Sequence, residues 1–444
     1  MATQTLSSVD HALALIRVQY MAGVPARLFH WPVAPVNPRT DTTTTTTATS
    51  DADGFVQAQI MATVGWSTQV GTSQRLPAWM LEVAVQRRMV AEIFQHPRCL
   101  SLPPSQAHAK SIAKYYYAQV EAARGDTCDE LVSLCVELLN LNTSDAEAAA
   151  AGGGSDDWCH RTYDLGFPQA ISTDPAALIS MKESRNIISK GTTGLAGWPA
   201  AHYLAEWLLQ HPSAVSGKKV MELGSGTGLV GIVAGTLRPK ILIASDYDTH
   251  VLSCLRHNLD LNGVLAKGAE LPARANATPA LVEDLDWFRV TERSLQAFGA
   301  ELVLAADVVY DPDLLDPLCK VLSGLLKVPS YRRIVPKAAP TAASGTTALA
   351  GDGSVQAPLP PVLTAGRPVA LVASTIRNPD IIEQFKTTLK THALEFTTLA
   401  ELPPLRLFYD RSLPVLLLAI TASSAAPAAA AAAAAAPTVA ATST

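Results

Sequence analysis

Acidic side chains stand at or near the ends of three short apolar runs in this sequence. Glu222 lies within VMELGSGTGLVG, Asp246 follows ILIAS, and Asp307 follows LVLAA. Tyr310 lies three residues after Asp307. If the apolar runs are parallel strands of one sheet, their carboxyl ends lie at one edge, where such sheets bind ligands. These are therefore the residues from which we expect chemistry.

The glycines that follow Glu222 fit the pattern of either of two cofactor sites. Residues 222–228 spell the E-x-G-x-G-x-G of a methyl-donor site, whereas residues 226–231 spell the G-x-G-x-x-G of a nicotinamide-binding turn. The run VMEL ends just before Gly224, so the turn must begin there, and the nicotinamide pattern starts two residues late. The register favours S-adenosylmethionine. The predicted contacts in the turn are Gly224, Ser225 and Gly226.

Two carboxylates support an adenosine-type cofactor. Glu222 suits S-adenosylmethionine, which carries a sulfonium and an amino group and has no phosphate; alternatively, Glu222 only orients the loop. Asp246 lies 24 residues later and can accept hydrogen bonds from both ribose hydroxyls. A charge-assisted pair of this kind contributes about 1.5–3 kcal/mol. Helix capping falls more naturally to Asp248, directly before the helical pattern that begins at Thr249.

Asp307 and Tyr310 lie where the transferable methyl group should leave the cofactor pocket. Enzymes that methylate amino groups on nucleic-acid bases usually carry N-P-P-Y or D-P-P-Y here, but Val308 and Val309 replace the prolines. A base is therefore disfavoured as the acceptor. We predict that Asp307 and Tyr310 accept hydrogen bonds and aim an amine nitrogen at the methyl group. The alternative is that Asp307 caps the following turn and Tyr310 packs in the core.

The elements that must position these residues follow from alternating apolar runs and helical patterns. This alternation predicts an α/β fold with a mostly parallel, doubly wound sheet. The expected helices include 249–261 and 381–391. The expected buried strands are 220–223, 241–244, 302–306, 369–373 and 415–420.

A second block, nearer the amino terminus, has helical periodicity. Residues 78–95 place most of their large apolar side chains on one face, and residues 129–140 repeat the pattern. Five segments hold too few large apolar side chains to offset the cost of ordering the backbone, and we expect loose loops there: 37–54, 143–157, 265–280, 329–366 and 422–444. The predicted parts are a helical module over 1–142, a flexible linker over 143–160, an α/β domain over 161–421 and an alanine-rich tail over 422–444.

Composition disfavours several classes of function. The 34 basic and 39 acidic residues give a net charge of −5, without the basic excess that nucleic-acid binding requires. No apolar run approaches the ~20 residues needed to cross a membrane, and no secretion signal is evident, so we expect a cytoplasmic protein. The six cysteines include no C-x-x-C pair and are expected to be reduced and mostly buried. No metal site is implied, and one sheet with a helical appendage fits a monomer.

At these residues the sequence resembles the elongation factor 2 lysine methyltransferase family, whose members have a seven-stranded, Rossmann-like class I methyltransferase sheet and a D-x-x-Y motif. The resemblance covers both blocks, and its narrowest features are the combination of GTTGLAGW, AADVVY and STIRNP. It implies an S-adenosylmethionine-dependent methyltransferase domain over 161–421, a protein-lysine acceptor and elongation factor 2 as substrate. The further matching stretches are QYMAGVPARLFHWP, VMELGSGTGLVGI and SDYDTHVLSCLRHNLDLNG.

Carried onto this sequence, the family pattern implies a cofactor pocket formed by Trp198, Gly224 to Gly226, Asp246, Trp287 and Ala306. The residues themselves agree with this, because Trp287 follows EDLD at the expected end of a third strand and its flat indole suits a purine. Trp198 ends the glycine-rich stretch GTTGLAG, which can fold over a ligand. The alternative for either tryptophan is ordinary core packing. Thr375, Arg377 and Asn378 follow another strand and are candidates for shaping the substrate groove, unless the last two only fix the loop.

Three other functions stay open on the sequence. The same enzyme class can act on another protein or on a small amine. A non-catalytic interaction protein can retain the fold. A nicotinamide oxidoreductase is the weakest alternative, because no Tyr-x-x-x-Lys or comparable hydride-transfer constellation is present.

Overall fold

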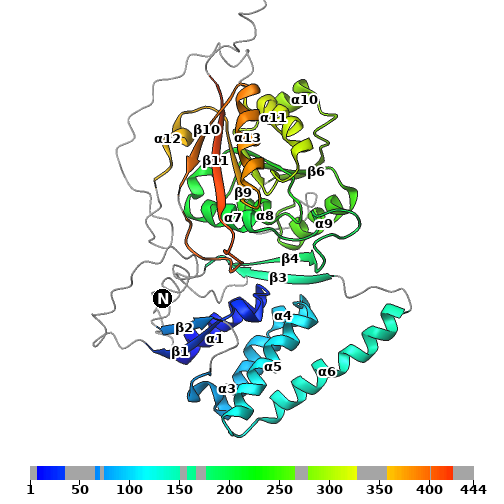
Figure 1. Ribbon diagram of the computed structural model, residues 1–444, viewed down its shortest axis with the longest axis vertical. Coiled ribbons are helices and arrows are strands. Elements are labelled where there is room, and N and C mark those ends of the chain that lie inside the picture. The colour runs from blue at the N-terminus through cyan, green and yellow to red at the C-terminus, as the bar shows by residue number, and fades with distance from the viewer. Residues whose placement is uncertain are drawn as a thin grey trace, which may run out of the picture.

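A seven-stranded sheet forms the centre of the larger of two parts of the molecule (Figure 1). The strand order is β10-β11-β9-β8-β5-β6-β7, and β11 runs antiparallel to its neighbours on both sides. The other paired strands run parallel. The computed structural model describes residues 8–35, 66–70, 75–150, 158–166, 177–265, 279–327, 358–400 and 402–423.

The strands of this sheet form because their sequences are almost continuously apolar, as expected for strands covered on both faces. All seven residues of β9 are buried, as are the first four of β8. The bounds are β5 Lys219–Leu223, β6 Ile241–Asp246, β7 Ala280–Asp284, β8 Leu302–Ala306, β9 Val369–Thr375, β10 Leu394–Leu399 and β11 Val415–Ala422. The five predicted strands and the predicted doubly wound α/β sheet are confirmed.

Helices cover both faces of the sheet, and alternate residues of each strand belong to two separate apolar clusters. Val220 and Leu302 pack with α7, α8 and α9, whereas Met221 and Val303 pack with α10, α11 and α13. The bounds are α7 Pro199–Gln210, α8 Leu229–Thr236, α9 Thr249–Leu261, α10 Glu292–Phe298, α11 Pro312–Leu326, α12 Pro361–Thr364 and α13 Pro379–Thr391. The helices predicted over 249–261 and 381–391 are therefore confirmed.

The amino-terminal module is mainly helical. Its helices are α1 Ser8–Met21, α3 Val83–Met89, α4 Pro97–Ser101, α5 Gln106–Ala122 and α6 Asp129–Ala150, with short turns η1 Ala26–Leu28, η2 Ala78–Leu81 and η3 Val90–Phe94. It also contains a two-stranded antiparallel sheet, β1 His30–Pro35 with β2 Trp66–Val70, that the sequence did not predict. The module predicted as helical therefore carries a small sheet as well.

The helix predicted over 78–95 is divided into three pieces. Glu82 is extended, with φ −62° and ψ 141°, and separates η2 from α3. The buried Gln86 side chain explains the break, because it donates to the carbonyl oxygens of Leu81 at 2.6 Å and Asp126 at 2.8 Å and accepts from the Cys128 amide. The predicted apolar face is nevertheless buried, including Met80, Val85, Met89, Ile93 and Phe94.

The loose linker predicted over 143–160 is contradicted at both ends. The α6 helix continues to Ala150, because alanine has the highest helix propensity of all residues and this segment is rich in it. At the other end, Trp158 begins strand β3. The predicted loops 37–54 and most of 329–366 lie outside the described residues, as do 266–278 and 424–444. The proposed domain limits stay a prediction.

A β-hairpin lies between the two parts of the molecule (Figure 1). It pairs β3 Trp158–Asp164 with β4 Leu178–Ser184 in antiparallel register. Its two strands contact α1 of the amino-terminal module and α9 of the α/β domain. The hairpin therefore joins the two parts physically.

The described residues contain no helix long and apolar enough to span a membrane and no group of three or more potential metal ligands. All six cysteines lie in described segments; five are buried, Cys135 is half-buried, and none forms a disulfide. The expected free thiols are thus confirmed.

Candidate functional site

A pocket of about 460 Å³ opens at the carboxyl ends of β5, β6 and β8. Its position agrees with the general location of ligands on open α/β sheets. Ten residues singled out from the sequence line it: Trp198, Glu222, Gly224, Ser225, Gly226, Asp246, Trp287, Ala306, Asp307 and Tyr310. The other three, Thr375, Arg377 and Asn378, are not among its lining residues.

The turn between β5 and α8 forms one wall of the pocket. Gly224, Gly226 and Gly228 have φ values of +60°, +54° and +92°, which glycine adopts without steric cost. A Cβ atom at Gly226 would lie 3.2 Å from the carbonyl oxygen of Gly194. The turn therefore needs glycine both for its backbone conformation and for its close approach to a second loop.

That second loop, residues 191–197, is called the covering loop here. It contributes Gly191, Thr192, Thr193, Gly194, Ala196 and Gly197 to the pocket lining. Trp198 follows it at the start of α7, and its indole nitrogen donates to the Thr193 carbonyl oxygen at 3.1 Å. GTTGLAG thus lies over the pocket as the sequence suggested, and Trp198 lines the pocket instead of packing only in the core.

Glu222 is buried at the base of the glycine turn. Burial, with a smaller contribution from the charge of Asp246, raises the pKa of its carboxyl group to about 8. Hydrogen bonds from Ser225 and from the Gly231 amide oppose this shift. These contacts support the loop-orienting role, while the position of Glu222 in the pocket wall also suits a cationic ligand.

Asp246 is held at the pocket edge by backbone donors. Its Oδ2 accepts from the Gly226 amide at 3.1 Å, and its Oδ1 accepts from the Tyr247 amide at 2.9 Å. Burial raises the pKa of this carboxyl group, and the backbone hydrogen bonds lower it. Asp248 caps α9 by accepting from the His250 and Val251 amides, which confirms the predicted capping role of Asp248, and the ribose role of Asp246 stays a prediction.

Ser225 fastens the glycine turn to the neighbouring strand. Its hydroxyl accepts from the Ser245 amide at 3.1 Å, and its own amide donates to the Ser245 carbonyl oxygen at 2.9 Å. Trp287 lies after β7, half-buried, and packs against the apolar cluster of α10 and α11 while lining the pocket. Its indole can therefore present one face to a planar ring.

Asp307 is surrounded by donors from the protein itself. Its Oδ1 accepts from the Thr375 amide at 2.9 Å, and its Oδ2 accepts from the Thr375 hydroxyl at 2.8 Å and the Ala200 amide at 3.3 Å. Arg377 adds two contacts of 3.1 and 3.3 Å. A carboxylate offers about four lone-pair positions, so these five contacts saturate it. The side chain is 5% exposed.

These contacts join the ends of β8 and β9 to the start of α7. The capping alternative for Asp307 is wrong, because Asp311 caps α11 by accepting from the Asp313 amide at 3.0 Å. Asp307 also has a φ of +54°, a conformation in which aspartate is less strained than bulkier residues. Its predicted role in aiming an amine stays a prediction, and its contacts make it first an anchor of this end of the pocket.

The three candidate residues at the end of β9 and just after it have separate roles. Thr375 is buried against Asp307, and the Arg377 guanidinium lies 4.8 Å from the Trp198 ring centre while it pairs with Asp307. Asn378 caps α13 by accepting from the Asp380 amide at 3.0 Å. The loop-fixing alternative therefore accounts for Asn378, and a role of these residues in substrate binding stays a prediction.

Tyr310 stands at the mouth of the pocket and is 51% exposed. Burial of its remaining surface raises the pKa of the phenol, whereas a hydrogen bond from the Thr193 side chain lowers it. The core-packing alternative is excluded by this exposure. Tyr310 thus links the covering loop to the side of the pocket that faces solvent.

Sequence reasoning missed several lining residues. Tyr247 and Phe288 are 67% and 64% exposed and lie at the pocket, each directly after a residue that had been identified. Val308, considered only as a replacement for proline, also lines the pocket and would meet a Cβ at Gly224 at 2.9 Å. The sequence signal that could have identified these three residues is that each directly follows a candidate site residue near the end of a strand.

The chain is similar to known lysine methyltransferases. A profile described as lysine methyltransferase matches residues 181–337. The chain is 32% identical over 304 residues to protein-lysine N-methyltransferase EEF2KMT of Homo sapiens, covering 68% of this chain and 76% of that protein. It is 30% identical over 253 residues to protein-lysine N-methyltransferase EFM3 of Chaetomium thermophilum, covering 55% of this chain and 70% of that protein.

Solved structures of methyltransferases match this chain with low TM-scores. The crystal structure of magnesium protoporphyrin IX methyltransferase (ChlM) from Synechocystis PCC 6803 with bound SAM is 12% identical, with a TM-score of 0.29, and the match covers 50% of this chain and 78% of that one. A TM-score of this size supports no conclusion about the chain.

Proposed function

The chain belongs to the EEF2KMT family of protein-lysine N-methyltransferases, and we propose that it transfers a methyl group from S-adenosylmethionine to a lysine of translation elongation factor 2. The observation that carries the proposal is the convergence of the glycine turn, Asp246, Trp287 and Tyr310 on one pocket. Each of these features was identified separately in the sequence, and the fold brings them together.

The residues present fit S-adenosylmethionine. A turn with three left-handed glycines leaves room for a ligand where side chains would intrude. Asp246 keeps capacity for a hydroxyl donor, because three backbone amides use three of its roughly four lone-pair positions. Glu222 offers a buried carboxyl group toward a cationic ligand, and the half-buried Trp287 offers a flat apolar surface. When bound, the cofactor supplies an electrophilic methyl group.

The acceptor lysine must lose a proton before its nitrogen can react. With a reference pKa of ~10.4, forming the neutral amine near pH 7.4 costs roughly 4 kcal/mol. Entry into a partly desolvated pocket lowers this cost, because burial disfavours the ammonium form. We assign to Tyr310 the aiming of the nitrogen and to Asp307 the fixing of the surrounding backbone. Water takes up the released proton, and no strong general base is assigned.

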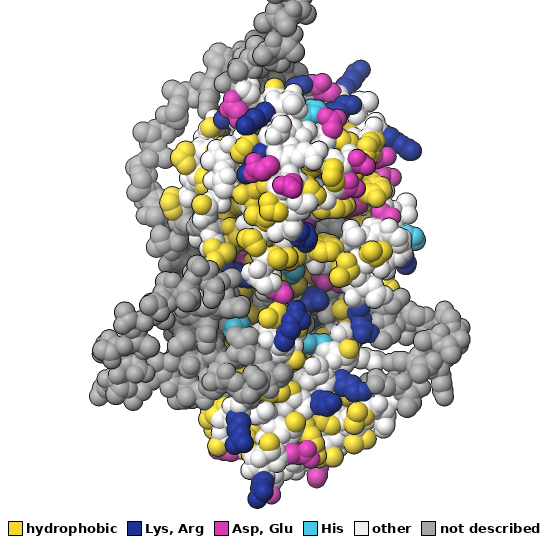
Figure 2. Space-filling view, viewed as in Figure 1, with side chains coloured by type: hydrophobic (Ala, Val, Ile, Leu, Met, Phe, Trp, Pro, Cys, Tyr) yellow, Lys and Arg dark blue, Asp and Glu magenta, His cyan; other side chains and the backbone are white. Residues whose placement is uncertain are grey.

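A protein is the acceptor that the pocket mouth suits. Tyr310, Tyr247 and Phe288 leave apolar surface exposed around the opening, where a polypeptide segment can pack. Over the α/β domain, the face in Figure 2 shows acidic and basic side chains interspersed. Together with the net charge of −5, this disfavours binding through nucleic-acid phosphates. We propose a monomer that works in the cytoplasm, where translation elongation takes place.

The decisive experiment incubates the purified chain with isotopically labelled S-adenosylmethionine and elongation factor 2, followed by peptide mass spectrometry. Label on a lysine of elongation factor 2 is the expected result. Label on other proteins of a lysate, with none on purified elongation factor 2, would retain the enzyme class and overturn the substrate. Absence of cofactor binding in a calorimetric titration would overturn the enzyme class as well.

A further inference from the structure

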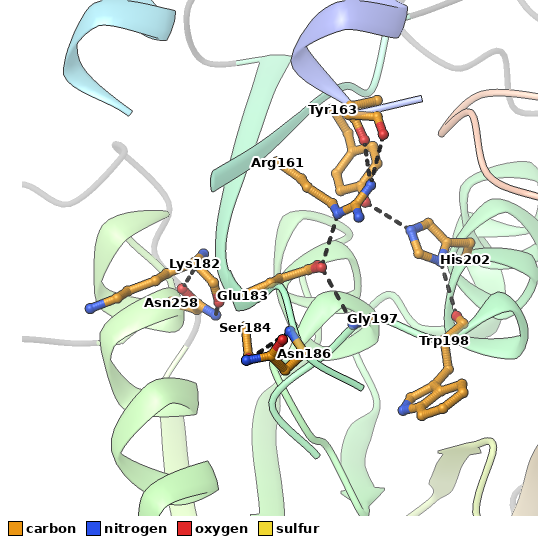
Figure 3. Close-up of polar contacts among 12 residues, drawn as sticks. Arg161, Tyr163, Lys182, Glu183, Ser184, Asn186, Gly197, Trp198, His202 and Asn258 are labelled. Atoms are coloured by element: carbon orange, nitrogen blue, oxygen red, sulfur yellow. Dashed lines mark hydrogen bonds and ion pairs between the residues drawn. The ribbon is translucent and has the colours of Figure 1, made fainter. Parts of the chain in front are cut away.

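The β3–β4 hairpin carries polar contacts that lead from the amino-terminal module to the covering loop. Figure 3 shows Arg161 on β3 pointing toward Glu183 on β4, and Glu183 pointing on toward Gly197. Neither Arg161 nor Glu183 lines the cofactor pocket. Any effect they have on the reaction must therefore pass through the residues they hold.

On the module side, Arg161 forms hydrogen bonds with the two residues that directly follow α1. Its Nη1 donates to the carbonyl oxygens of Ala22 at 2.9 Å and Gly23 at 3.2 Å. Gly23 has a φ of +67°, and a Cβ there would lie 2.9 Å from the same nitrogen. The backbone of the module therefore fixes where this guanidinium can lie.

On the catalytic side, Glu183 binds the covering loop. Its Oε2 accepts from Arg161 Nε at 3.1 Å and from the Gly197 amide at 3.4 Å, and its side chain is 4% exposed. A Cβ at Gly197 would lie 3.0 Å from Glu183 Oε1, so the contact leaves no room for a larger residue. The neighbouring Ser184 amide donates to the Leu195 carbonyl oxygen at 2.7 Å. The covering loop is thus held at two points by β4.

A second line of contacts runs beside the first. The Tyr163 hydroxyl lies 2.8 Å from His202 Nε2, and His202 Nδ1 lies 2.9 Å from the Trp198 carbonyl oxygen (Figure 3). Tyr163 is on β3 and is buried. The hairpin therefore also holds the residue that directly follows the covering loop.

We propose that Arg161 and Glu183 are positioning residues for cofactor binding, which hold the covering loop closed over the pocket and make the amino-terminal module a structural part of that site. The inference rests on the proposed use of S-adenosylmethionine but not on the identity of the protein acceptor. It predicts that a substitution in the module, far from the pocket, weakens cofactor binding.

The test measures S-adenosylmethionine affinity of the full chain by calorimetry, below the melting temperature of every variant. Glu183→Gln removes the ion pair and should raise the cofactor Kd about tenfold. Arg161→Met should behave similarly, and Arg161→Lys should restore part of the affinity because it keeps the positive charge. In Gly23→Ala the added methyl group would displace the Arg161 guanidinium, and we expect the cofactor Kd to rise about threefold.

Two matched controls separate positioning from general destabilisation. Glu206→Gln breaks another Arg–Glu pair, that of Glu206 with Arg411, which is more deeply buried and does not touch the covering loop. Gly263→Ala places alanine at a φ of +65° with no atom within 4 Å of the new Cβ. Both should lower the melting temperature and leave the cofactor Kd within about twofold of the parent.

The cofactor Kd values of the variants and of the two controls decide between the proposal and general destabilisation. A Kd that rises in the Glu183, Arg161 and Gly23 variants but not in the two controls supports the proposal. A Kd unchanged in Glu183→Gln and Gly23→Ala, or raised equally in Glu206→Gln and Gly263→Ala, overturns it. If the parent binds the cofactor and these results hold while elongation factor 2 is not methylated, the substrate proposal fails and the positioning proposal stands. A parent chain that does not bind the cofactor overturns both proposals.

Discussion

The two ends of the pocket are built differently, although both place a carboxylate at the end of a parallel strand. At the β5–β6 end, backbone amides hold Asp246 and leave part of its accepting capacity unused. At the β8–β9 end, side chains and amides from three elements saturate Asp307. Asp246 can therefore still accept a hydrogen bond from a ligand, whereas Asp307 stabilises the local protein structure.

This difference shows why a motif residue is not always a contact residue. Asp246 ends β6 and Asp307 directly follows β8, yet the donors around them differ. Around Asp246 they are the backbone amides of Gly226, Tyr247 and Asp248, and around Asp307 they include Thr375 and Arg377, 68 and 70 residues away. A residue can therefore be required for activity through the geometry that it fixes.

The largest effect is expected at the cofactor end, from Gly226→Ala. Alanine at a φ of +54° is strained, and its methyl group would press on the Gly194 carbonyl oxygen at 3.2 Å. We expect S-adenosylmethionine affinity to fall by about 100-fold or more, equivalent to about 2.7 kcal/mol, in a calorimetric titration. Gly263→Ala carries a similar backbone strain without the contact and should bind normally. Equal losses in both variants would contradict this account of the glycine turn.

The next effect is expected at the other end, from Asp307→Asn. Asparagine tolerates the left-handed backbone. Its side-chain NH₂ group, however, is a hydrogen-bond donor and would face the donor groups of Thr375 and Arg377. We expect kcat to fall by about 100-fold, while the cofactor Kd changes by less than about threefold. Steady-state kinetics with saturating cofactor provide the measurement.

Asp311→Asn is the matched control for this substitution, because Asp311 caps α11 and asparagine caps helices equally well. Its kinetics should match those of the parent. If Asp307→Asn weakens cofactor binding as strongly as it lowers kcat, the two ends of the pocket do not differ in the way described.

A smaller effect is expected from Tyr310→Phe. The substitution keeps the ring and removes the hydroxyl that meets Thr193. The kcat/KM for the protein acceptor should fall about tenfold, or about 1.4 kcal/mol, because one hydrogen bond is lost in the transition state. Tyr247→Phe changes another exposed phenol of the same pocket and should leave kcat/KM nearly unchanged. If kcat/KM falls more in Tyr247→Phe than in Tyr310→Phe, the residue that contacts the acceptor is Tyr247 and not Tyr310.

The smallest effect concerns stability and Glu222. Because burial raises the pKa of this carboxyl group to about 8, the folded chain retains a proton that the unfolded chain releases above its ordinary pKa of about 4.5. Between these values the group makes the free energy of unfolding fall as pH rises, by at most about 1.4 kcal/mol per unit. Glu222→Gln should remove this contribution, so the variant gains stability over the parent by about 1–2 kcal/mol between pH 6 and pH 8.

Urea unfolding of the cofactor-free chain at both pH values checks this expectation. Glu283→Gln, on β7 and half-exposed, is the control and should follow the parent. If the parent and Glu222→Gln show the same pH dependence, Glu222 is ionised in the folded chain and its carboxylate is already compensated.

The cofactor end could be predicted almost entirely from the sequence. The strand, the glycine turn, the helix and the second carboxylate follow one another over residues 219–246, and local rules of backbone conformation and periodicity govern each. The same rules placed the cap of α9 at Asp248. Local rules succeeded because the strand, the left-handed glycines and the helix of this turn each follow from a few consecutive residues.

The acceptor end and its support depended on the tertiary structure. The sequence by itself determined which strands form and where their polar residues lie, because periodicity and glycine conformation act over a few residues. Only the folded chain decided that Asp307 is saturated and that Arg161 and Glu183 connect a distant module to the covering loop. Those outcomes depend on donors brought together from segments far apart in the chain, and no local pattern encodes which partner a carboxylate will meet.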